Sequence, residues 1–177
     1  ADLLQATASS LLLIDQETGE LVFDVVSGGG GTLLEQRRMS ASAGIPGWVI
    51  AHQQPLIVND AGHDPRVRRD IAESVAFPLK AIIAVPMIAR GRIIGVLEVL
   101  NKHSGQDFTQ DDLDLLCALA AQAAVAIENA RLYQDLRQER DRLIDTEEMV
   151  RKKLQRELHD GLAQTLAAMA MKANVVS

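Results

Sequence analysis

The C-terminal part of the chain is the most constrained, because residues 110–177 contain no proline and only one glycine, Gly161. Proline removes a backbone donor and interrupts helices, so its absence over this length permits one continuous helix. Thr109 precedes the segment and Asp112 lies three residues later, which approximates a capping box with Asp in place of Glu. Further acidic residues in the first turn suit the positive end of a helix dipole. We therefore expect one long helix that starts directly after Thr109.

The apolar side of this helix narrows along its length. Up to Ile127 the sequence "LLCALAAQAAVAI" is apolar nearly all round, as in a helix that packs on a sheet. A sparse seam then runs through a highly charged segment, which needs a partner helix, most simply the same helix of a second subunit. A solvated helix that bridges two domains is the alternative. The seam consists of Leu132, Leu136, Leu143, Val150 and Leu154, and it is interrupted by Glu139, Thr146 and Lys153.

The part before residue 108 has the pattern of short strands separated by turn residues. It predicts strands over 9–15, 21–27, 56–60, 81–89 and 92–101, with "RGR" as a tight hairpin between the last two. "QRRMSAS" is expected to be an edge strand. "GIPGWVIAHQQP" is expected to form a short helix that ends before Pro55, and "DPRVRRDIAESVA" a short surface helix. The predicted fold class is α+β.

Composition excludes several classes of protein. The 177 residues are 47% hydrophobic, enough for a globular core in one domain with an appendage or in two small domains. The net charge of −6 disfavours direct nucleic-acid binding. Cys117 has no second cysteine to pair with, which favours a reducing compartment and a buried position.

The sequence also bears on location. We find no segment of ~20 apolar residues and no signal peptide, so we expect a cytoplasmic protein. The chain begins with Ala and both ends suggest a piece of a longer protein. Any membrane attachment is expected only through segments outside this chain.

Three segments resemble a GAF domain: "GIPGWVIAHQQPLIVNDAGHDPR", "AVPMIARGRIIGVLEVLNK" and "FTQDDLDLLCALAAQAAVAIENARLY". The resemblance covers roughly residues 1–133. It implies an antiparallel sheet with helices on one face, and with loops and short helices that enclose a pocket on the other. The first helix of the family is expected to be truncated here, with "ADLLQAT" as its tail.

One motif of this family can be compared residue by residue. Asn101, Lys102, Phe108 and Asp112 match it, whereas Leu113 stands where the family has Glu. The resemblance implies a structural clamp between Lys102 and Asp112, and the lost Glu weakens the case for a cyclic nucleotide. Cys117 lies on the core helix rather than where bilin-binding relatives attach the pigment. His52, His63 and His103 lack metal-ligand spacing, so no metal is expected. The ligand of the domain stays unknown, and the domain could have none.

The segment "VRKKLQRELHDGLAQTLAAMAM" resembles the first helix of the dimerisation and phosphotransfer domain of histidine kinases, in the subfamily with an H-D-x-x-x-Q motif. The resemblance implies that His159 accepts the phosphoryl group, that Asp160 is its general base, and that Gln164 positions water for dephosphorylation of the regulator. Imidazole suits this role because its neutral form is well populated near neutral pH. A surface histidine without a catalytic role is the alternative.

These resemblances together predict a GAF sensor domain over 1–126, a signalling helix over 127–153 and the start of the phosphoacceptor domain over 154–177. The intact protein is expected to be an ATP-dependent sensor histidine kinase that uses Mg²⁺, forms a homodimer and passes phosphate to a response regulator with a DNA-binding output domain. The chain carries no nucleotide-binding motif of the kinase ATPase domain, so it should be inactive alone. The alternatives are a non-catalytic GAF ligand-binding and dimerisation module, and a silent scaffold that relays signals.

Overall fold

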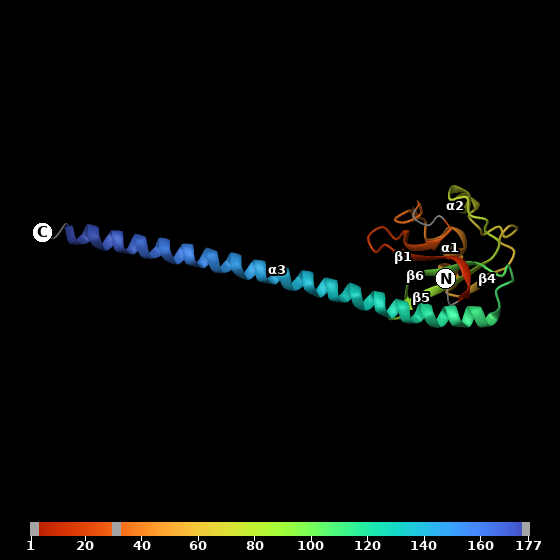
Figure 1. The fold of residues 1–177 in the computed structure, drawn as a ribbon. Coiled ribbons are helices and arrows are strands. Elements are labelled where there is room, and N and C mark those ends of the chain that lie inside the picture. Colours follow the sequence, from red (N-terminus) through yellow and green to blue (C-terminus); the bar gives the residue numbers. More distant parts are fainter. Residues whose placement is uncertain (1–3, 30–32, 175–177) are drawn as a thin grey trace. The chain divides into compact units, whose positions relative to one another are not determined.

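The computed structural model describes residues 4–29 and 33–174, without the side chains of 156–160 and 162–174. Its chain divides into two compact units, Ala1–Glu128 and Asn129–Ser177, and each is treated by itself below. The first unit contains one antiparallel sheet with the strand order β3-β2-β1-β6-β5-β4 (Figure 1). The strands are β1 (Ala6–Ile14), β2 (Leu21–Gly28), β3 (Arg38–Met39), β4 (Leu56–Val58), β5 (Ile82–Ala89) and β6 (Arg92–Lys102).

Strands β1 and β6 form the centre of the sheet. Their antiparallel register places Leu12 opposite Val96 and Ser10 opposite Glu98. Gly95 allows the two backbones to approach closely, because a Cβ atom at this position would lie 2.2 Å from the carbonyl oxygen of Leu12. Arg90 and Gly91 connect β5 to β6 with positive φ angles of 51° and 74°, which are typical of the tight hairpin turn that the sequence predicted.

The first part of helix α3 (Gln110–Asn174) covers one face of this sheet. Leu113, Leu116, Ala120 and Ala124 are buried in one cluster with sheet residues such as Val85. The alanines have small side chains, so the helix backbone can lie close to the strands. The long helix and its contact with the sheet agree with the α+β fold predicted from the sequence.

Two short helices and several loops cover the opposite face. Helix α1 (Gly44–His52) packs Ile45 and Val49 against Ala84 and Val96. Helix α2 (Arg69–Ser74) has no buried residue and lies at the surface. A further cluster around Phe23 fills the space beside β1 and β2. This two-sided burial explains why the central strands are apolar on both faces.

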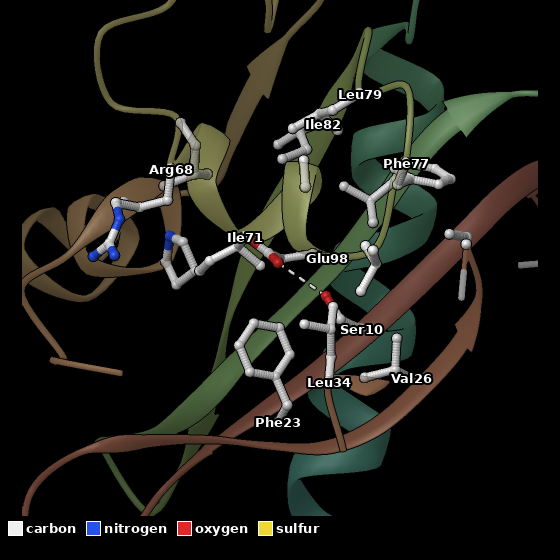
Figure 2. Close-up of a pocket in the computed structure, with 18 of the residues that line it drawn as sticks. Ser10, Phe23, Val26, Leu34, Arg68, Ile71, Phe77, Leu79, Ile82 and Glu98 are labelled. Atoms are coloured by element: carbon white, nitrogen blue, oxygen red, sulfur yellow. Dashed lines mark hydrogen bonds between the residues drawn. The ribbon is translucent and has the colours of Figure 1, made fainter. Parts of the chain in front are cut away.

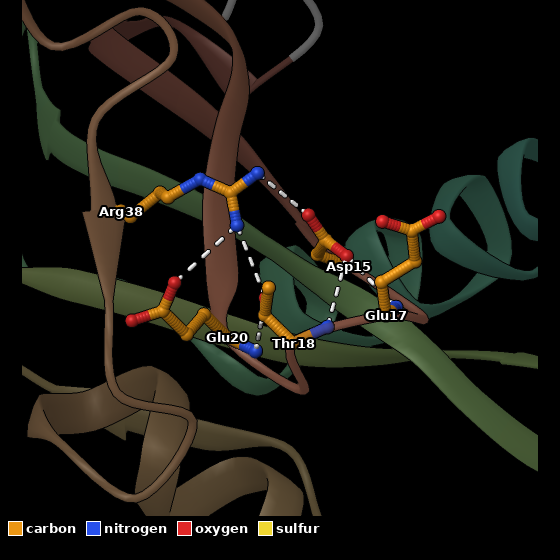
Figure 3. Close-up of polar contacts among 5 residues, drawn as sticks. All are labelled: Asp15, Glu17, Thr18, Glu20 and Arg38. Atoms are coloured by element: carbon orange, nitrogen blue, oxygen red, sulfur yellow. Dashed lines mark hydrogen bonds and ion pairs between the residues drawn. The ribbon is translucent and has the colours of Figure 1, made fainter.

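Arg38 attaches the short edge strand β3 to the turn between β1 and β2 (Figure 3). Its guanidinium lies 2.6 Å from a carboxylate oxygen of Asp15 and 3.3 Å from Glu20, and it donates to the hydroxyl of Thr18 at 3.0 Å. Asp15 also accepts bonds from the backbone amides of Glu17 and Thr18. The bond from Arg38 is the main reason why the pKa of Asp15 lies below its ordinary value. A strand of only two residues is thereby held in register by side chains.

Lys102 and Asp112, the expected structural clamp, lie 2.5 Å apart, and each side chain is about one-sixth exposed. The carboxylate of Asp112 also accepts hydrogen bonds from the backbone amide and the hydroxyl of Thr109. In return, the backbone amide of Asp112 donates to that hydroxyl at 3.3 Å. Burial alone would raise the pKa of Asp112, but the bonds from Lys102 and Thr109 outweigh this effect and lower it. The end of β6 and the start of α3 are thus joined by one ion pair that also caps the helix.

The N-terminal segment differs from its expected form. Ala6 and Thr7 are the first residues of β1, whereas the sequence suggested that they end a helix. Ala6 pairs with Lys102 of β6, and the hydroxyl of Thr7 donates to the carbonyl of Leu100. Pairing with the long strand β6 satisfies the backbone groups of this segment, so a local helix has no advantage.

From Asn129 onward, helix α3 belongs to the second unit. Along its described residues the seam residues Leu136, Leu143, Val150 and Leu154 are more than half exposed. By length and composition alone, a stretch within Gln110–Gln155 is apolar enough to cross a membrane, which the sequence analysis did not expect. The first part of α3 packs on the sheet of a globular unit, and the core helix of such a unit can meet the same criteria.

Candidate functional site

The face of the sheet opposite α3 contains a cavity of about 90 Å³. Strands β1, β2 and β6, helices α1 and α2, and the loop before β5 all contribute to its wall. The wall is almost entirely apolar, and Phe23, Leu34, Ile71, Leu79 and Ile82 are among its residues (Figure 2). This is the enclosed site that the GAF resemblance implied.

One carboxylic acid, Glu98 of β6, lies in the apolar wall. Its side chain is only 6% exposed, and its carboxylate accepts a bond of 2.9 Å from the hydroxyl of Ser10 on β1. Among the described residues, Ser10 is its only hydrogen-bond partner (Figure 2). Burial raises the pKa of Glu98 to about 7, although the bond from Ser10 acts in the opposite direction. The cavity therefore contains a carboxyl group that changes its charge near neutral pH.

Arg68 is the other charged residue in the wall, but it does not neutralise Glu98. Its guanidinium binds both carboxylate oxygens of Asp70, at 2.7 and 2.6 Å. In Figure 2 the guanidinium lies at the edge of the cavity and points away from Glu98. No other lysine, arginine or histidine belongs to the wall, as far as the chain is described. The carboxylate of Glu98 is thus without a cationic partner.

The sequence analysis did not select Glu98, although a signal was present. In "RIIGVLEVLN" it is the only acidic residue, and the period of two places it with Val96 and Leu100 on one face of the strand. Charged residues are almost never fully buried without a partner. A lone acid in the middle of a strand with two buried faces could therefore have been recognised as a site residue.

The other residues considered from the sequence lie elsewhere. The ring of His52 stacks on Trp48 with centroids 4.2 Å apart, and His63 contacts Asp60 at 2.9 Å. Cys117 is partly rather than fully buried, and burial raises the pKa of its thiol. Across the described residues, no three His, Cys, Asp or Glu side chains form a group that could hold a metal ion.

The expected phosphoacceptor residues belong to the second unit. His159, Asp160 and Gln164 have helical backbone within α3, and Asp160 and Gln164 are one helical turn apart. Their side chains lie outside the described residues, so their contacts and roles stay predictions.

Comparison with protein families identifies both parts of the chain. Residues 1–127 match the family described as GAF domain, which is well over half of the sequence. The chain belongs to the GAF domain family. Residues 150–177 match a second family, described as histidine kinase. The two resemblances on which the sequence analysis relied are thereby confirmed.

Two similar proteins have different names. An uncharacterized sensor-like histidine kinase from Chloroflexus aurantiacus is 42% identical over 97 residues, which are 55% of this chain and 16% of that protein. A probable 3',5'-cyclic phosphodiesterase pde-5 from Caenorhabditis elegans is 30% identical over 76% of this chain and 20% of its own length. The chain thus spans a fifth or less of these relatives.

The fold also matches solved GAF structures. The GAF domain of a phosphoenolpyruvate-protein phosphotransferase from Coxiella burnetii superposes with a TM-score of 0.65 at 22% identity, over 72% of this chain and 75% of that one. At this identity the similarity establishes the GAF fold alone. The predicted antiparallel sheet with an attached long helix is therefore confirmed as a GAF architecture.

The raised pKa of Glu98 predicts how stability depends on pH. The carboxyl group titrates near 4.5 when exposed and at about 7 in the folded chain, so the native state holds the proton more tightly. This contribution to stability is complete below pH 4.5 and is lost as the pH rises through 7. At ~1.4 kcal/mol per pH unit, the contribution of Glu98 to the free energy of unfolding should fall by about 3 kcal/mol over this window.

Glu98→Gln should remove this fall, because the amide stays neutral and its oxygen can still accept the bond from Ser10. Urea unfolding of both proteins between pH 4.5 and 8 measures the difference. The exposed acid Glu73 of α2 offers a control, and Glu73→Gln should retain the wild-type pH dependence. An equal fall in the wild type and in Glu98→Gln would contradict the assignment.

Proposed function

We propose that this chain is the sensor and first phosphoacceptor helix of a two-component sensor histidine kinase. The observation that carries the proposal is the continuity of α3, which joins the core of the GAF domain to the segment that matches histidine kinases. A helix without a break can transmit a change of rotation or tilt from the sensor to the phosphoacceptor. The GAF domain supplies the input and His159 receives the phosphoryl group.

His159 and Asp160 share the autophosphorylation step in this proposal. One imidazole nitrogen attacks the γ-phosphorus of ATP, and the new N–P bond forms as the bond to the ADP oxygen breaks. Asp160 is the general base that takes the proton from the other ring nitrogen, a role that carboxylates can fill in acid–base catalysis. ATP and Mg²⁺ bind to a catalytic domain of the intact protein, so this chain alone should not phosphorylate itself.

Gln164 acts in a different reaction, the dephosphorylation of the response regulator. It positions a water molecule for hydrolysis of the phosphorylated response regulator, by the logic of the water-orienting glutamine of GTPases. The partner is a response regulator with a DNA-binding output domain. The protein acts in the cytoplasm and touches a membrane only through segments beyond this chain.

The exposed seam of α3 supports a homodimer. Leu136, Leu143, Val150 and Leu154 are more than half exposed on this helix, so apolar surface is available for a partner. Burial of such side chains contributes roughly 1.5–3 kcal/mol each, so pairing two copies of the seam is strongly favourable. The interruptions at Glu139, Thr146 and Lys153 limit the stability of the pair.

A second candidate function is a GAF module that binds a ligand and dimerises without any phosphotransfer. The cavity with its buried carboxyl group favours this alternative, because it is a formed site that needs no kinase chemistry. The two functions differ in whether His159 is ever phosphorylated.

Phosphorylation of the intact protein tests the choice. With ATP and Mg²⁺, the wild type should gain acid-labile, base-stable phosphate, and His159→Ala should lose it completely. Asp160→Ala should slow labelling by about 10²-fold or more, the usual contribution of a general base. Labelling that persists in His159→Ala would reject this residue as the acceptor. His63→Ala, in the GAF domain, should be labelled like the wild type.

Gln164→Ala should separate the two reactions. Autophosphorylation should stay within about twofold of the wild type, whereas dephosphorylation of the phosphorylated regulator should slow by about tenfold or more, because the attacking water is no longer oriented. The decay of regulator phosphate measures the second reaction. Unchanged decay would show that Gln164 does not position the water.

Leu143→Lys tests the dimer. The 177-residue chain should sediment at twice its own mass, and a charge in the seam should weaken association by at least about tenfold. Gln134→Lys is the matched control, since this exposed residue faces the opposite side of the same helix and should leave the dimer unchanged. A wild-type chain that sediments as a monomer at all accessible concentrations would contradict the homodimer.

A further inference from the structure

The charge without a partner in the GAF cavity is concentrated in one group. Its wall contains two ionisable residues, Glu98 and Arg68. Arg68 is paired with Asp70, so Glu98 is the only one that lacks a partner of opposite charge. Strands β1, β2 and β5 and helix α1 contribute no titratable group to the wall.

A buried carboxylate has two ways to avoid the cost of an unpaired charge. It can hold a proton, or it can bind a cation that forms hydrogen bonds with it. The hydroxyl of Ser10 occupies one oxygen of Glu98, which leaves acceptor capacity on the other oxygen. The apolar wall beside it favours a cation that carries a hydrocarbon group.

We propose that the cavity of this GAF domain binds a small primary amine with an apolar body, whose ammonium group pairs with Glu98 while its hydrocarbon part contacts the wall around Phe23, Leu34 and Ile71. The cation would replace the proton as the partner of the carboxylate. Ser10 holds the carboxylate in position for this contact.

The size of the cavity limits the ligand. An engineered apolar cavity of about 150 Å³ binds benzene, so a space of about 90 Å³ suits a smaller, branched aliphatic group. A nucleotide is disfavoured, because its phosphate would approach an acidic residue. Anions in general are disfavoured by the same carboxylate.

The charge of the cavity should make binding depend on pH. An alkyl amine keeps its charge between pH 5 and 9, so the change in this range comes from Glu98, whose pKa burial raises to about 7. Arg68 stays charged throughout. Amine binding should strengthen as the pH rises from 6 to 8, because Glu98 loses its proton over this interval.

The inference deepens the sensor role proposed above, and it relies on that role only for its biological meaning. Its test uses the 177-residue chain and direct binding, so it can fail while phosphorylation of His159 succeeds, and the reverse. The probes are isobutylamine, isobutanol and isobutyrate, which share one branched carbon skeleton and differ in charge. Titration calorimetry, together with the backbone amide signals of Ser10 and Glu98, reports binding.

At pH 8, isobutylamine should bind at least about tenfold more tightly than isobutanol, because a charge-assisted hydrogen bond is stronger than a neutral one. Isobutyrate should bind more weakly than both. Amine affinity should drop by about fivefold or more at pH 6, with little change for the alcohol. Equal affinities of the amine and the alcohol, or no measurable amine binding, would overturn the proposal.

Two variants locate the effect. Glu98→Gln should remove the preference for the amine and its pH dependence while the alcohol still binds. Ala72 lines the cavity from α2, a surface helix without buried residues. Ala72→Leu should therefore fill part of the cavity without disturbing the core, and it should weaken binding of the amine and of the alcohol alike. A preference for the amine that survives Glu98→Gln would show that the cation binds elsewhere.

Discussion

The packing of α3 on the sheet is the contact on which both halves of the molecule depend. Leu116, Ala120 and Ala124 are almost fully buried against β5 and β6, and the ion pair between Lys102 and Asp112 fixes the point where the helix begins. The same helix then continues, without a break in its backbone, into the segment that matches the family described as histidine kinase. The GAF core therefore determines where α3 starts and which side of its first part is covered.

The two faces of the sheet have different surroundings. One face meets a helix through aliphatic side chains, and the other faces a cavity that holds a carboxyl group among apolar residues. Relatives with this fold occur as parts of proteins with unlike names, among them a sensor-like histidine kinase and a probable phosphodiesterase. The fold alone therefore does not determine function, which depends on the residues of the site.

The sequence predicted most strands because turn residues separate them and because their apolar runs are short. The hairpin at Gly91 and the start of α3 after Thr109 were predictable from local chemistry alone. Helix α2 is shorter than expected, since the carboxylate of Asp64 binds the backbone amide of Arg66 and forms a turn that competes with the helix. The hydrogen-bond partner of Glu98 could not be predicted from the sequence, because only the pairing of β1 with β6 brings Ser10 beside it. The phosphoacceptor residues are predicted by resemblance only, and their side chains lie outside the described part of the chain.

Strand β6 carries Glu98 and Val99 side by side, and the alternation of a strand directs one toward the cavity and the other toward the layer under α3. The cavity and the layer under α3 are consequently separated, at this point of the sheet, by a single peptide unit. A displacement of the backbone at Glu98 would therefore act directly on Val99, which packs beneath the helix.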